Sequence, residues 1–73
     1  MLRRSVNSSV IKSLGYSAAD QVLEVQFRNG RIYQYIGVPA EEYDALLSAN
    51  SVGGYFNKMI RDRYEARRGA SAT

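Results

Sequence analysis

Two tyrosines, Tyr33 and Tyr35, stand two residues apart in the middle of the chain, and two arginines, Arg28 and Arg31, precede them. Side chains at this spacing point to the same face of a strand. On an exposed face, such rings would stack on unpaired nucleic-acid bases while the guanidinium groups contact phosphates. On a buried face, the same rings would fill a small hydrophobic core. The pattern leaves both interpretations open.

A second group of cations lies in the C-terminal third of the chain. The net charge is +3 over residues 1–39, −3 over residues 40–50 and +3 over residues 51–73, so the formal total of +3 conceals a basic C-terminal segment. Such a surface binds phosphates whatever the nucleic-acid sequence, although cations near a helix end also stabilise the helix. The predicted phosphate contacts are Arg28, Arg31, Lys58, Arg61, Arg67 and Arg68.

A candidate anion site lies at Ser51, Gly53 and Gly54, where a helix is predicted to begin. A helix N-terminus presents unpaired N–H groups, and glycine lets a phosphate approach the backbone closely. Glycines at this position also suit a second explanation, in which they allow the helix to pack closely against a neighbouring segment. The residue types alone do not separate the two.

Catalytic chemistry has little support in the sequence. The 73-residue chain has no histidine and no cysteine, which removes the side chain that titrates near neutral pH, the thiol nucleophile and the commonest metal ligands. The acidic group of Glu41, Glu42 and Asp44 is explained by the positive end of a helix dipole. We therefore expect no catalytic residue, no metal site, no cofactor, no small-molecule substrate and no enzymatic activity.

Five elements are predicted to position these residues. Alternating apolar side chains predict strands over residues 10–16, 22–27 and 32–36. Helical spacing predicts one helix from Pro39 to about Asn50 and another from Ser51 to about Tyr64. The predicted fold class is α+β: a three-stranded antiparallel β-meander followed by two α-helices packed on one face.

The domain organisation follows from these boundaries. Residues 1–7 are expected to form a flexible N-terminal arm, residues 8–66 a single domain and residues 67–73 a flexible basic tail of small residues. No apolar run approaches the ~18 residues of a membrane span, and no hydrophobic stretch follows the N-terminal arginines as in a secretory signal. We therefore expect a cytoplasmic protein.

The loop between the second and third predicted strands decides which face the tyrosines occupy. Asn29-Gly30 supplies the positive φ angles that tight hairpins need. A two-residue loop would place both tyrosines on the solvent-exposed face of the sheet, together with Arg28 and Arg31. A three-residue loop with a bulge at Gly30 shifts the alternation by one residue and moves both tyrosines into the core. The sequence is compatible with either loop.

Around these tyrosines the chain resembles the KTSC domain. This short bacterial family is named for its occurrence at the C-terminus of some lysyl-tRNA synthetases, and it is also found as a free-standing domain. The family has a central Tyr-x-Tyr motif, which Tyr33-Gln34-Tyr35 matches. The likeness runs from about Val6 to Tyr64. In order, it takes in Gly15-Tyr16, Leu23-x-Val25-x-Phe27, Asn29-Gly30, Val38-Pro39, Ala49-x-Ser51-x-Gly53, Tyr55-Phe56-Asn57 and Ile60-Arg61. The synthetase context implies RNA binding and assigns no role to any single residue.

Two functions fit these observations. The first is a non-catalytic binding module that contacts RNA or another nucleic acid through the basic helix and the Tyr-x-Tyr face. The alternative is a protein-interaction module or homodimer that uses a sheet edge or an uncovered sheet face. The first or third strand of the meander would supply the free edge. Neither function involves a membrane.

Overall fold

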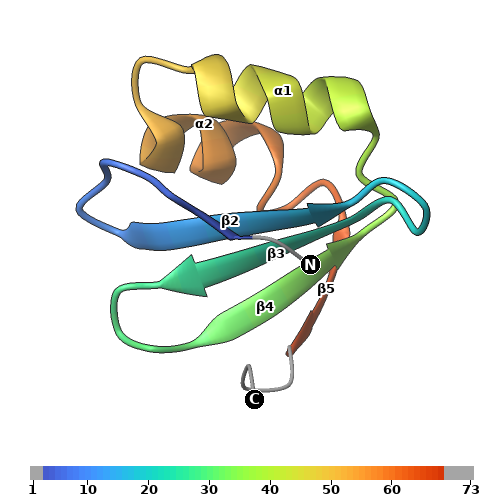
Figure 1. Cartoon of the computed structure of the whole chain (residues 1–73), viewed down its shortest axis with the longest axis horizontal. Helices are drawn as coiled ribbons and strands as arrows, with labels where there is room; N and C mark the ends of the chain where they lie inside the picture. Colours follow the sequence, from blue (N-terminus) through green and yellow to red (C-terminus); the bar gives the residue numbers. More distant parts are fainter. Residues whose placement is uncertain (1–2, 69–73) are drawn as a thin grey trace.

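The computed structural model describes residues 3–68. Five antiparallel strands form one sheet in sequence order, and both helices cover the same face of this sheet (Figure 1). The elements are β1 (Arg3–Ser5), β2 (Ile11–Ser17), β3 (Val22–Phe27), β4 (Ile32–Ile36), α1 (Ala40–Ser48), α2 (Val52–Met59) and β5 (Glu65–Arg68). No helix within these residues is long and apolar enough to cross a bilayer.

The predicted three-strand meander is present as β2, β3 and β4, with both helices on one side, but the prediction of three strands is incomplete. Strand β1 pairs with β2, and β5 pairs with β4, so two further strands flank the meander. Both were missed because neither shows an apolar alternation: β1 is Arg-Arg-Ser, and every residue of β5 is exposed. The edges expected to be free for a partner are therefore covered.

Because of these flanking strands, the segments predicted to be a flexible arm and a flexible tail are partly strand. The predicted N-terminal arm of residues 1–7 contains β1, and the predicted tail of residues 67–73 begins inside β5. Residues 1–2 and 69–73 lie outside the described part of the chain. Helix α2 ends at Met59, earlier than predicted, and the chain then turns so that β5 can return along β4.

The hairpin between β3 and β4 has the three-residue loop. The Phe27 N–H donates to the Arg31 carbonyl at 2.8 Å, and Gly30 takes a positive φ of 92°. In the resulting register, Val25 lies opposite Tyr33 and Leu23 lies opposite Tyr35. Both tyrosines therefore share the face of the core residues, which is the face that the helices cover.

The core lies between this face and the helices. Leu14, Leu23, Val25 and Leu46 are completely buried, and Tyr35 is only 4% exposed. Each helix begins one residue later than predicted, after Pro39 for α1 and after Ser51 for α2, and the Ser51 side chain caps α2 by accepting the Gly54 N–H. The core therefore depends on aromatic as well as aliphatic side chains, because so short a chain has little apolar mass to bury.

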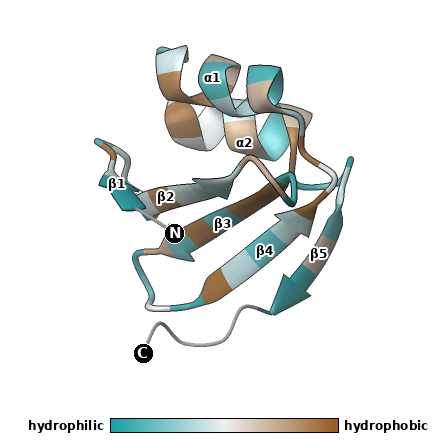
Figure 2. Ribbon diagram, turned by 45° about the vertical axis from the view of Figure 1, so that its right-hand side comes forward, coloured by the Kyte–Doolittle hydropathy of each residue, from teal (hydrophilic) through white to brown (hydrophobic). Residues whose placement is uncertain are grey.

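The opposite face of the sheet carries a polar network centred on Glu24, which is 9% exposed although no helix covers it. The Glu24 carboxylate accepts hydrogen bonds from Arg3 in β1 and, at 3.2 Å, from Gln34 in β4. Arg3 and Ser13 both donate to Gln26. Figure 2 shows that the edge strands β1 and β5 are mainly hydrophilic. Polar contacts therefore join several strands on the face that no helix covers.

Replacing Gly30 with alanine should lower the free energy of unfolding by about 1–2 kcal/mol, because a Cβ atom disfavours positive φ. No neighbouring atom lies within 4 Å of the position that the Cβ would occupy, so the loss would report backbone conformation rather than a clash. Urea unfolding measures it. Gly30→Asn is the control, because asparagine tolerates positive φ better. Equal losses in the two variants would contradict this account.

Stability should fall as the pH rises above about 10, because several tyrosines hold their protons more tightly in the folded chain. Burial raises the pKa of four of them, and a hydrogen bond to the Glu42 carboxylate raises the pKa of Tyr55. The four are Tyr16, Tyr35, Tyr43 and Tyr64. The free energy by which these protonated tyrosines stabilise the fold is fully present below the unfolded-state pKa, and it is lost as the pH rises through the folded-state pKa.

The measurement is the thermal midpoint from neutral to alkaline pH, with the phenolate absorbance followed in parallel. Tyr64→Phe removes one of the titrating groups and should flatten the alkaline decline. A midpoint that does not fall through the range in which phenolate forms would contradict the prediction.

Candidate functional site

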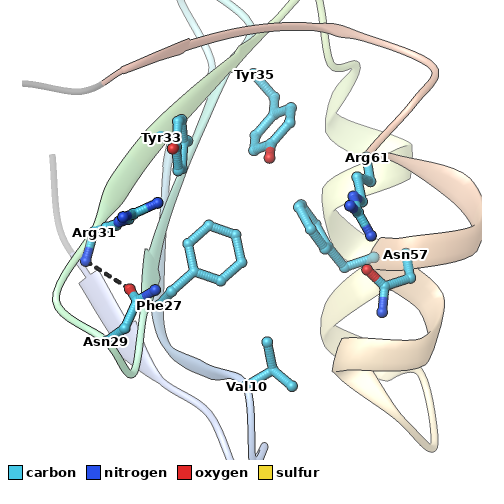
Figure 3. A pocket seen from close by; sticks show the side chains of 9 residues that line it. Val10, Phe27, Asn29, Arg31, Tyr33, Tyr35, Asn57 and Arg61 are labelled. Carbon is cyan, nitrogen blue, oxygen red and sulfur yellow. Dashed lines mark hydrogen bonds between the residues drawn. The ribbon is translucent and has the colours of Figure 1, made fainter.

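A cleft of about 350 Å³ lies between the β3–β4 hairpin and α2 (Figure 3). We call it the aromatic cleft. Its apolar lining consists of Val10, Phe27, Tyr33, Tyr35 and Phe56, and its polar lining consists of Asn29, Arg31, Asn57 and Arg61. Sequence-distant residues meet here because the hairpin register directs the β4 tyrosines toward the helix layer. The cleft therefore exists only in the folded arrangement of hairpin and helix.

The rings of the cleft hold one another in edge-to-face contacts. The ring centroid of Phe27 lies 5.9 Å from that of Tyr33 and 5.6 Å from that of Phe56, with interplanar angles of 72° and 70°. Phe56 also meets Tyr35 at 5.2 Å and 79°. Such geometry is favourable beyond area burial alone. The rings thus form one continuous packed aromatic surface.

Two arginines face the cleft from opposite sides, Arg31 from the hairpin and Arg61 from the turn just after α2 (Figure 3). The ion pairs found within residues 3–68 join other partners, so neither guanidinium is neutralised by a carboxylate. Burial raises the pKa of the Tyr35 hydroxyl, and the nearby positive charge of Arg61 opposes that rise. The cleft is therefore aromatic inside and cationic at its rim.

The asparagines add directed hydrogen-bonding groups. Asn29 Oδ1 accepts the Arg31 N–H at 2.9 Å, which shapes the loop and leaves the Asn29 amide N–H groups available to donate. Asn57 enters the lining from the opposite side, on α2 (Figure 3). Together with the guanidinium groups, these amides make a lining richer in donors than in acceptors. A ligand with acceptor oxygens and a flat apolar surface fits this chemistry.

The register separates the two tyrosines of the Tyr-x-Tyr motif. The stacking interpretation required an exposed pair, and Tyr35 is only 4% exposed, so its ring belongs to the core. Tyr33 is half-buried and lines the cleft beside Phe27. The motif thus contributes one core ring, Tyr35, which also borders the cleft, and one half-buried ring, Tyr33, to the cleft surface.

The predicted phosphate contacts divide in the same way. Arg31 and Arg61 line the cleft, whereas Lys58 is exposed on α2 outside it. Arg68 lies opposite Tyr33 in the β4–β5 register and therefore extends from the same sheet face. The remaining two have structural partners. Arg28 donates to the Ser8 carbonyl at 2.7 Å, and Arg67 pairs with Glu65 at 2.6 Å.

The predicted anion site at the start of α2 has a structural explanation. Ser51 Oγ already accepts the Gly54 N–H at 3.1 Å, so one amide that an anion would use is occupied. A Cβ atom on Gly53 would lie 3.2 Å from Ser8 Oγ. These contacts favour the second explanation, in which the glycine allows the β1–β2 connection to approach the helix.

The sequence did not identify Asn29, Asn57, Phe27 and Phe56 as neighbours of the predicted arginines. The periodicity of Phe27 and Phe56 indicates a buried face, Asn29 with Gly30 indicates only a hairpin turn, and nothing in the sequence places Asn57 beside the arginines. The missing information was the hairpin register together with the packing of α2 against that hairpin. A firm assignment of the three-residue loop would have placed Tyr33 beside Phe27.

This fold, an α+β domain with a five-stranded antiparallel sheet and two helices on one face, can be compared with known proteins. The chain belongs to the KTSC domain family, whose model matches residues 7–64. It is also similar to a KTSC domain protein of Yersinia pestis in a crystal structure, with a TM-score of 0.91 and 38% identity over 94% of this chain and 97% of that one.

Relatives occur both as small proteins and inside a larger enzyme. The chain is 42% identical over 64 residues to an uncharacterised protein of Stutzerimonas stutzeri, covering 88% of this chain and 90% of that protein. It is 37% identical over 57 residues to a lysine–tRNA ligase of Nostoc punctiforme, covering 78% of this chain and 10% of the ligase. The likeness to the ligase is thus confined to a tenth of that enzyme.

Arg28→Ala should lower the free energy of unfolding by about 0.5–1.5 kcal/mol, because it removes the side-chain hydrogen bond to the Ser8 carbonyl, one of the bonds between the hairpin and the β1–β2 connection. Arg31→Ala, its matched control, should change the free energy by less than about 0.5 kcal/mol, since its side chain has no hydrogen-bond partner within the described residues. Urea unfolding of both variants tests this assignment. A larger loss in Arg31→Ala would show that its side chain has a structural role.

Proposed function

We propose that this domain is a non-catalytic module that binds unpaired nucleic acid, RNA in particular, in the aromatic cleft. The observation that carries the proposal is the pair of unneutralised arginines, Arg31 and Arg61, on either side of a fixed aromatic surface. A guanidinium group binds phosphate, and an aromatic ring stacks on any base. The cleft therefore combines the two contacts that sequence-tolerant recognition of a single strand requires.

A single strand fits this site better than a duplex. The bases of a paired helix are stacked on one another, and only an unpaired base can turn its face toward Tyr33 or Phe27. A cleft of about 350 Å³ lies within the range of sites that hold small organic groups. The proposed mode is one base in the cleft, with the adjoining phosphates between Arg31 and Arg61.

The relatives support the same class of ligand. A lysine–tRNA ligase acts on a tRNA, so the matching segment of the Nostoc punctiforme enzyme belongs to a protein that handles RNA. The alternative of protein interaction has less support. The edges of β2 and β4 that were predicted to be free are paired with β1 and β5, so the open edges of the sheet are two short, mainly hydrophilic strands, and the Glu24 network lies on the uncovered face.

Fluorescence anisotropy with short single-stranded RNA at low salt tests the proposal. Binding should be weak and should decline as the salt concentration rises. Arg31→Ala and Arg61→Ala should each weaken binding roughly threefold to tenfold. Each should also reduce the slope of log affinity against log salt by about 0.7, the value for one phosphate contact on a single strand.

Lys58→Ala is the matched control, because it removes one exposed cation from α2 without altering the cleft. It should have a smaller effect than either arginine substitution. Equal losses in all three variants would indicate attraction by net charge and would contradict a cleft-centred mode. An absence of binding at protein concentrations of hundreds of micromolar would overturn the proposed function.

A further inference from the structure

A second hollow of about 280 Å³, which we call the polar groove, adjoins the aromatic cleft. It lies between the β1–β2 connection and the segment that joins α1 to α2. The groove and the cleft share two lining residues, Val10 and Asn57. Val10 is 46% exposed, unlike the other large apolar side chains of the described residues. The two hollows therefore meet at one exposed apolar side chain and one amide.

The chemistry of the polar groove differs from that of the cleft. Its lining includes no charged residue and no aromatic ring. Two hydroxyls are already committed to the fold, since Ser8 Oγ accepts the backbone N–H groups of Val10 and Ile11 and Ser51 Oγ caps α2. Among the polar side chains that line the groove, four have no hydrogen-bond partner within residues 3–68: Asn7, Ser9, Asn50 and Asn57. These four supply donors and acceptors at once.

The phosphate, the base and the sugar of a nucleotide differ in how well they match the polar groups of this lining. A phosphate would find no cation there to replace its counterions, and a base would find no ring on which to stack. The sugar remains, because its hydroxyl groups are neutral and both donate and accept hydrogen bonds, as asparagine and serine side chains do. The groove therefore matches the sugar and the cleft matches the base and phosphates.

We infer that the polar groove binds ribose 2′-hydroxyl groups of the strand whose base occupies the cleft, so that the domain selects RNA over DNA. The inference rests on the proposed function, since it assigns the sugar next to a bound base. It does not depend on the helix N-terminus, because Ser51 satisfies the Gly54 amide. The shared position of Asn57 lets one strand contact both hollows along α2.

The test compares three strands of identical sequence: oligouridine, its deoxyuridine counterpart and its 2′-fluoro counterpart. The fluoro strand keeps an RNA-like sugar pucker and lacks the hydroxyl donor. The domain should bind the RNA roughly threefold to tenfold more tightly than the DNA, as expected for one or two hydrogen bonds. The fluoro strand should bind like the DNA. A fluoro strand that binds like the RNA would overturn the inference, because pucker would then explain the preference.

The double variant Ser9→Ala, Asn50→Ala removes uncommitted groups from both walls of the groove. It should reduce the RNA-to-DNA affinity ratio to about one while leaving the DNA affinity unchanged. Ser48→Ala, an exposed serine outside the groove, should keep the ratio. Thermal unfolding confirms that each variant is folded.

The outcomes separate the two proposals. Equal affinity of the native domain for RNA and DNA, or a preference that survives in the double variant, would overturn the sugar assignment and leave the proposed function standing. Failure of all three strands to bind would overturn the proposed function and the sugar assignment with it.

Discussion

The positive φ of Gly30 determines where the aromatic side chains of this domain lie. With the bulged three-residue loop, Tyr33 and Tyr35 follow Leu23 and Val25 onto the face that the helices cover. A shift of one residue would move both rings to the opposite face and bring polar side chains into the core. The cleft, the buried Tyr35 and the edge-to-face contacts of Phe56 all depend on this one backbone conformation.

A polar network centred on Glu24 stabilises the other face of the sheet. No helix covers that face, yet Glu24 is nearly as buried as a core residue. The hydrogen bonds that it accepts from Arg3 and Gln34 join β1, β3 and β4, so charge-assisted contacts connect the strands on the face that no helix covers. The short strand β1 supplies Arg3, which gives this edge strand a role that its own three residues would not suggest.

The central strands and both helices could be predicted because their apolar residues repeat with periods of two and of about 3.6 residues. Strands β1 and β5 could not, since the partners that stabilise them are backbone groups of neighbouring strands and the sequence records no such pairing. The register stayed open because Asn29-Gly30 suits two loop lengths. Arg31, Tyr33 and Arg61 were identified as candidates by type, but their convergence depends on packing between segments about thirty residues apart.

Stability and recognition share the same rings in so small a domain. Phe56 is almost completely buried and still borders the cleft, and it contacts Phe27 and Tyr35 in the core. A separate binding surface would need apolar mass that a 73-residue chain does not have. The arginines avoid this conflict, because Arg31 and Arg61 are exposed and have no carboxylate partner within the described residues. Charge at the rim can therefore vary independently of the fold, whereas the aromatic surface cannot.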